Sequence, residues 1–91
     1  MVYVIAQLKL ESYDRWKAVF DERSSVRKEM GSKEARLFGN LDNPNEVMIL
    51  FDWDTMEKAR NYLESETLRK TLKNIGVTYT ITYLDELAKT F

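Results

Sequence analysis

The chain has 91 residues with 14 basic and 15 acidic side chains, a formal net charge of −1, and neither cysteine nor histidine. This length suits a single domain over residues 1–91, and the balanced, interleaved charges argue against a nucleic-acid partner. Without cysteine or histidine the chain lacks disulfides, thiolate metal sites, the commonest general base and the usual haem ligand, so we expect no metal and no cofactor.

Residues 2–8 form the first predicted element, a strand rich in β-branched residues. Both alternating sets of its side chains are mostly apolar, so we expect both faces of this strand to be covered. Over residues 12–30 the apolar spacing predicts one amphipathic helix that begins after Ser12 and ends before Gly31. Arg23 and Arg27 on this helix are expected to pair with nearby acidic side chains.

Residues 34–40 are the next predicted strand, and the LDNPN segment supplies the turn of a hairpin. The hairpin leads into residues 44–55, which are apolar at nearly every position. Alternation divides this third strand into one face with Val47, Ile49, Phe51 and Trp53 and a second face with Met48, Leu50 and Asp52. We expect Asp52 to lie at the rim of the second face, where Lys9 or Arg36 can meet it.

The second helix is predicted to begin at Asp54, because Asp54 and Glu57 have the spacing of a capping box. Ser65 is expected to restart this helix, which then ends at Gly76. Residues 77–84 alternate β-branched and aromatic side chains, a pattern that predicts the last strand.

The predicted order of elements is β-α-β-β-α-β, the ferredoxin-like pattern of an α+β fold. Right-handed crossovers place both helices on one face of a four-stranded antiparallel sheet, with the first and third strands at its centre. The second apolar sets of these central strands then leave a bare apolar face of roughly several hundred Å². Covering two such faces releases on the order of 15 kcal/mol, at least comparable to the 4–15 kcal/mol cost of association. We therefore predict a homodimer that packs sheet against sheet.

Several features together resemble the dimeric α/β-barrel superfamily that includes the antibiotic-biosynthesis monooxygenases. They are the element order, the NPNEV hairpin, Trp53 at the end of the third strand and the YLESETLRK segment of the second helix. Residues 13–22, followed by Arg27 and Gly31, are similar to a small subgroup whose members are mostly uncharacterised. The resemblance implies a barrel of two facing sheets and, in each subunit, a cleft between helices and sheet for a flat or hydrophobic molecule. Some relatives oxygenate aromatic polyketides without metal or flavin, whereas others degrade haem, isomerise lactones or sense stress.

The haem-degrading branch of this superfamily can be compared with the chain residue by residue. In that branch the site contains an asparagine on the first strand, a tryptophan at the end of the third strand and an iron-ligating histidine on the second helix. The positions of this chain that resemble them are Gln7, Trp53 and Leu72. Leucine cannot coordinate iron, and no histidine elsewhere in the chain can replace it, so ordinary haem degradation is not expected.

The candidate ligand-binding residues are Gln7, Trp16, Phe20, Phe51, Trp53 and Leu72. The aromatic rings can stack on a planar ligand and the Gln7 amide can orient it, while core packing is the alternative role for the aromatic residues. Tyr79 and Tyr83 share a strand face, and a tyrosine hydroxyl can donate a proton. The sequence assigns no catalytic residue.

Two functions remain open at this stage. The first is a homodimer whose cleft binds a small hydrophobic or aromatic molecule and acts on it as a cofactor-independent monooxygenase or cyclase-like enzyme. The alternative is a non-enzymatic ligand-sensing or structural dimer, which the missing histidine and cysteine favour. The N-terminal residues lack the features of a signal peptide, and the longest apolar run is too short to span a bilayer. We therefore expect a cytoplasmic protein without a membrane partner.

Overall fold

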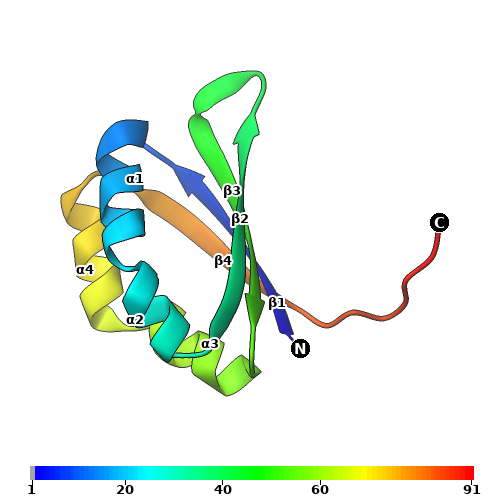
Figure 1. The fold of residues 1–91 in the computed structure, drawn as a ribbon. Helices are drawn as coiled ribbons and strands as arrows, with labels where there is room; N and C mark the ends of the chain where they lie inside the picture. Colours follow the sequence, from blue (N-terminus) through cyan, green and yellow to red (C-terminus); the bar gives the residue numbers. More distant parts are fainter. Residues whose placement is uncertain (1) are drawn as a thin grey trace.

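A four-stranded antiparallel sheet carries the helices on one of its faces in the computed structural model, which describes residues 2–91 (Figure 1). The strands are β1 (Val2–Lys9), β2 (Ser32–Asn40), β3 (Asn43–Trp53) and β4 (Thr78–Leu84), and the helices are α1 (Tyr13–Glu22), α2 (Ser24–Glu29), α3 (Met56–Leu63) and α4 (Glu66–Asn74). The strand order β2-β3-β1-β4 places the first and third strands at the centre. The predicted ferredoxin-like α+β fold is confirmed.

Two short helices, α1 and α2, replace the single helix predicted over residues 12–30. Ser12 caps α1 as expected, and its hydroxyl accepts from the backbone N–H of Arg15 at 3.2 Å. The helix ends one residue before Arg23, which has φ −93° and ψ 6° and serves both as the C-cap of α1 and as the N-cap of α2. Two serines follow Arg23, and serine favours helix ends because its hydroxyl competes for backbone hydrogen bonds.

Thr55, and not Asp54, caps α3. The Thr55 hydroxyl accepts from the backbone N–H of Lys58 at 3.2 Å, and the Asp54 carboxylate instead pairs with the Lys58 ammonium at 2.8 Å. The backbone N–H of Asp54 donates to the Gly31 carbonyl at 2.9 Å, which holds this residue beside the α2–β2 loop, one residue too early for capping. The restart at Ser65 is confirmed, since its side chain accepts from the N–H of Leu68 at 3.3 Å.

The two faces of the sheet differ in what covers them. The inner face lies under the helices and holds buried side chains of the central strands: Val4, Ala6 and Leu8 of β1, and Val47, Ile49, Phe51 and Trp53 of β3. The opposite face, here called the open face, carries Ile5 and Leu50 paired in register at its centre. Phe38 and Met48 on that face are 44% and 38% exposed. Both faces of the central strands therefore carry apolar side chains, as the sequence predicted.

Residues 85–91 continue beyond β4 as an extended tail. The tail leaves the sheet on the side of the open face and away from the helices (Figure 1). Leu87 and Phe91 in this tail are 95% and 124% exposed, so these two apolar side chains are almost fully in solvent.

The backbone conformation of Gly31, between α2 and β2, can be tested by substitution. We predict that Gly31→Ala lowers the free energy of unfolding by about 1–3 kcal/mol, because its φ of 109° disfavours any side chain. A Cβ there would also lie 3.0 Å from Lys58 Cδ and 3.2 Å from Trp53 Nε1. The matched control is Gly39→Ala on β2, where nothing lies within 4 Å of the added atom. Urea denaturation measures both, and equal losses in the two variants would contradict the prediction.

Candidate functional site

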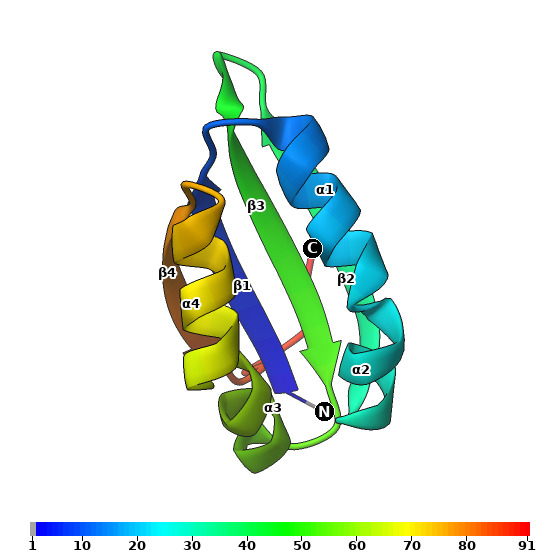
Figure 2. The ribbon, with the colours of Figure 1, turned by 90° about the vertical axis from the view of Figure 1, so that its left-hand side faces the viewer.

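A small apolar cavity of about 50 Å³ lies between the inner face of the sheet and the helices. The residues that line it belong to β1, β3 and β4 and to all four helices. Figure 2 shows these helices lying over one face of the sheet. Four predicted ligand-binding residues line it together: Trp16, Phe20, Phe51 and Leu72. An engineered cavity that binds benzene measures about 150 Å³, so an aromatic ligand requires this cavity to widen. The lining side chains that are only partly buried can move to allow this: Val19, Phe20, Arg23, Tyr79 and Ile81.

A continuous row of aromatic rings runs along the inner face beside the cavity. The ring centroids are 5.1 Å apart for Trp16 and Phe20, 6.5 Å for Phe20 and Phe51, 5.5 Å for Phe51 and Trp53, and 5.7 Å for Trp53 and Tyr62. These distances lie in the range in which aromatic pairs attract each other. The row gives the cavity flat walls that suit a planar ligand.

Trp53 stands on the inner face but does not line the cavity. Its side chain is fully buried, and its indole N–H donates to the Met30 carbonyl at 3.1 Å. That hydrogen bond satisfies both a buried donor and a carbonyl at the end of α2. The position of Trp53 therefore matches the core-packing alternative considered from the sequence.

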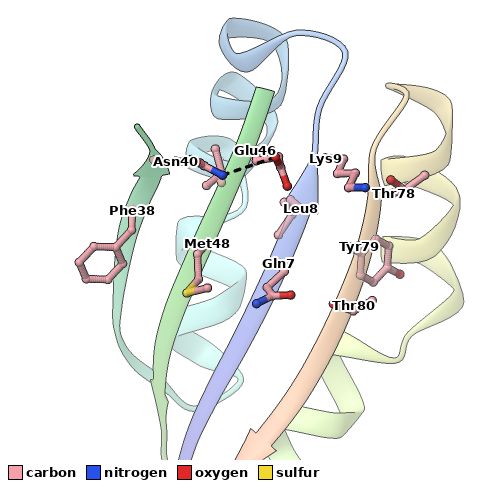
Figure 3. A pocket seen from close by; sticks show the side chains of 12 residues that line it. Gln7, Leu8, Lys9, Phe38, Asn40, Glu46, Met48, Thr78, Tyr79 and Thr80 are labelled. Carbon is pink, nitrogen blue, oxygen red and sulfur yellow. Dashed lines mark hydrogen bonds between the residues drawn. The ribbon is translucent and has the colours of Figure 1, made fainter. Parts of the chain in front are cut away.

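Gln7 lies on the open face, on the other side of the sheet from the aromatic row. Its neighbours in register are Met48 on β3 and Thr80 on β4 (Figure 3). Together with Phe38 these residues line an open hollow of about 610 Å³. The grouping of Gln7 with the aromatic walls was wrong, because side chains one residue apart on a strand point to opposite faces and Ala6 takes the inner position.

Arg27 is the functional candidate that the sequence reasoning missed. Its guanidinium donates to the Phe20 carbonyl at 2.7 Å and lies 3.7 Å from the centroid of the Phe20 ring. Arg23 donates to Thr71 Oγ1 at 3.0 Å, and both arginines line the cavity. Neither one forms an ion pair with an acidic residue within residues 2–91, so the predicted pairing is wrong. The sequence signal was the i, i+4 spacing of two arginines on the helix face that carries Phe20.

Asp52 on the open face also lacks the partners expected for it. Its Oδ1 atom is buried and accepts no hydrogen bond from the described residues. Lys9 pairs in register with Glu46 at the far end of β3, and Arg36 lies over the Phe38 ring. The predicted contact of Asp52 with Lys9 or Arg36 is therefore wrong, and an unsatisfied carboxylate oxygen remains on this face.

Tyr83 makes a contact at the surface and does not line the cavity. Its hydroxyl donates to the Glu64 carboxylate at 2.8 Å, and the Arg60 guanidinium lies 4.1 Å from the centroid of its ring. Burial raises the pKa of Tyr83 to about 12, with a further contribution from the hydrogen bond to Glu64. The same hydrogen bond, followed by that from Arg60, lowers the pKa of Glu64. Tyr83 is thus a poor proton donor near neutral pH, and only Tyr79 of the two lines the cavity.

Two further features bear on the kind of site. In residues 2–91 no group of three or more acidic, histidine or cysteine side chains could hold a metal ion. None of the helices in this part of the chain is both long enough and apolar enough to cross a membrane.

The fold and the cavity define a ferredoxin-like α+β domain with an apolar pocket between helices and sheet. Residues 1–74 match the sequence model of one family, "Antibiotic biosynthesis monooxygenase". The chain belongs to this family. A comparison with curated protein sequences returns no match.

Solved structures with the same fold cover nearly the whole chain. SnoaB, a cofactor-independent oxygenase from Streptomyces nogalater, is 12% identical with a TM-score of 0.77 over 97% of this chain and 94% of its own. A putative antibiotic biosynthesis monooxygenase from Deinococcus radiodurans is 17% identical with a TM-score of 0.67 over 100% and 97%. A dimeric ferredoxin-like protein from an uncultured marine organism is 8% identical with a TM-score of 0.66 over 100% and 99%. At these identities the likeness shows the fold alone.

The Tyr83–Glu64 contact predicts a loss of stability at alkaline pH. The folded chain keeps the Tyr83 proton up to about pH 12, whereas the unfolded chain loses it near the ordinary pKa of 10.0. Between about pH 10 and about pH 12 the folded state therefore binds more protons than the unfolded state. The free energy of unfolding falls as the pH rises through this range. Urea denaturation across this range should give a smaller decline for Tyr83→Phe than for the wild type. A Tyr13→Phe variant controls for removal of a hydroxyl, and parallel declines in the wild type and Tyr83→Phe would contradict the assignment.

Proposed function

We propose that this protein is a homodimer in which each subunit binds a hydrophobic or aromatic small molecule in the inner cavity and oxygenates it as a cofactor-independent monooxygenase. The observation that supports this most directly is the apolar cavity with Trp16, Phe20 and Phe51 in its walls. Family membership and the similarity to SnoaB support the same reaction class.

The proposed reaction places the chemistry on the substrate itself. An electron-rich aromatic substrate supplies all four electrons that reduce molecular oxygen, because one of its CH₂ groups is oxidised to a carbonyl. One oxygen atom enters a substrate CH₂ group as a carbonyl, and the other leaves as water with the two hydrogens of that group. The protein contributes a dry, shaped cavity that holds the ring, and this role needs no side chain of the chain to be oxidised.

The dimer half of the proposal rests on the open face. Tyr3, Ile5, Leu50 and Met48 form a contiguous apolar strip across the two central strands, with Phe38 next to Met48 on β2. The exposed apolar tail also projects on this side (Figure 1). A second copy that packs sheet against sheet covers both the apolar strip and the tail.

A non-enzymatic ligand-sensing or structural dimer is the second candidate. The observation that favours it is the character of the cavity, which measures about 50 Å³ and has no carboxylate among its lining residues. A cavity without a carboxylate lacks a strong general base for deprotonating a substrate.

The dimer is tested at the centre of the open face. We predict that Ile5→Lys converts a dimer into a monomer in sedimentation equilibrium at micromolar concentration, because the change buries an unpaired charge in the interface. Ala18→Lys, which adds the same charge at an exposed position on α1, leaves the dimer intact. A wild-type chain that sediments as a monomer would refute the proposed assembly.

Oxygen consumption tests the activity. We predict that the wild type accelerates oxygen uptake by anthrone, an electron-rich aromatic compound with a CH₂ group between two rings. Val19→Trp should reduce this rate at least about tenfold, because the new ring fills the cavity that Val19 lines. Ala18→Trp places the same ring one residue away on the exposed side of α1 and keeps the wild-type rate. If the wild type binds anthrone without accelerating its oxygen uptake, and Val19→Trp abolishes that binding, the sensor is favoured over the enzyme.

A further inference from the structure

Arg27 is the one charged residue in the buried set of residues 2–91, with 6% of its surface exposed. It lies on α2, and its guanidinium carbon lies 3.7 Å from the centroid of the Phe20 ring. An arginine side chain remains positively charged in proteins, and it carries five N–H donors in a planar fork. The described residues supply one acceptor to this fork, the Phe20 carbonyl. A buried cation with a single neutral acceptor is an expensive feature of a fold.

The surroundings of Arg27 add to its positive charge. Arg23 stands one turn earlier and donates to the neutral hydroxyl of Thr71. The ion pairs found in residues 2–91 join other residues, at N–O distances from 2.7 to 3.5 Å. Two like charges four residues apart destabilise a helical segment. The local charge is therefore suited to an anion that is not part of the folded chain.

The position of the two arginines connects this charge to the cavity. Arg23 and Arg27 line the cavity together with Phe20 and Phe51, and the other side chains around it are aliphatic or aromatic. The cavity surface itself is almost wholly apolar, so a ligand meets the guanidinium of Arg27 where the cavity widens beside the Phe20 ring. There its apolar body would lie against the rings and its polar group against the guanidinium.

We infer that the ligand of this cavity is an aromatic molecule that carries an oxyanion, a carboxylate or an ionised phenol, which pairs with Arg27. This inference rests on the proposed ligand-binding function and specifies the chemical class of its ligand. Hydrogen bonds between a guanidinium and an oxyanion are charge-assisted, and they strengthen where water is excluded. An ionised phenol is also more electron-rich than its neutral form, so the same contact favours the proposed reaction with oxygen.

A purely structural role for Arg27 is the competing explanation. The Phe20 carbonyl belongs to the last turn of α1, where carbonyls lack intrahelical partners, and the Arg27 hydrogen bond satisfies it. This role needs a hydrogen-bond donor but no charge. A neutral donor at position 27 therefore separates the two explanations.

The test compares benzoate with benzyl alcohol, two ring compounds of similar size that differ in charge. Calorimetric titration of the wild type at pH 7 should show benzoate binding about ten to a hundred times more tightly, the range expected for charge-assisted hydrogen bonds. Arg27→Gln keeps a hydrogen-bond donor at this position, and Arg27→Met keeps most of the apolar stem of the side chain without a donor. Both should lose the preference for benzoate and still bind benzyl alcohol. Arg60→Met is the matched control, because it also removes an arginine that lies over an aromatic ring, Tyr83, but outside the cavity.

A third probe, 4-nitrophenol, distinguishes the two sources of the oxyanion, because its absorption shifts to longer wavelength on ionisation. A shift on binding to the wild type that is absent in Arg27→Gln supports an ionised phenol, and a benzoate preference that is lost in the same variant supports a carboxylate. Equal binding of benzoate and benzyl alcohol, without a nitrophenol shift, overturns the inference and leaves the cavity as a neutral binding site. Retention of either signal in both Arg27 variants also overturns it. If none of the three compounds binds the wild type, the proposed function fails together with the inference.

Discussion

The pairing of β1 with β3 at the centre of the sheet is the constraint on which the other features depend. The register runs from Val2 opposite Trp53 to Lys9 opposite Glu46 without interruption. A slip of one residue would exchange the inner and open faces of a strand, so the pattern of side chains specifies this register strongly. The register places Phe51 under the helices, where it meets Phe20, and it places Leu50 and Ile5 together on the open face. One interaction therefore positions both the wall of the cavity and the apolar strip on the opposite side.

Most of the fold could be predicted from the sequence, because period-two and helical spacing of apolar residues report which side of an element is covered. Trp16, Phe20, Phe51 and Leu72 were grouped correctly for this reason, since each follows the apolar pattern of its element. Gln7 was misplaced because it was assigned by its resemblance to the asparagine of the haem-degrading branch, although strand alternation puts it on the face opposite Ala6 and the aromatic walls. Its two strand neighbours, Ala6 and Leu8, are the residues that reach the inner face.

The spacing of Arg23 and Arg27 was visible in the sequence, but the burial of Arg27 was not, because a charged residue on an amphipathic helix is normally solvated. Its burial depends on the break at Arg23, which the helical pattern does not reveal. Because α1 ends at Glu22, the Phe20 carbonyl is left without an intrahelical partner, and the guanidinium of Arg27 reaches back to it over the Phe20 ring. A helix end thus holds a cation at the edge of an apolar cavity. Such a feature is visible only after the tertiary packing is known.

The cavity and the open face are two sides of the same central strands, and this arrangement limits where the cavity can widen. Ala6 and Phe51 contribute to its floor, and the residues next to them in the chain, Ile5 and Leu50, form the centre of the open face. Packing against a second copy would hold this floor still, because the strands would then be covered on both faces. The cavity can widen on its helix side, where Val19 and Phe20 are only partly buried, and at β4, where Tyr79 and Ile81 are also only partly buried. A ligand that enters between the helices passes the edge of the cavity where Arg27 and the Phe20 ring lie together.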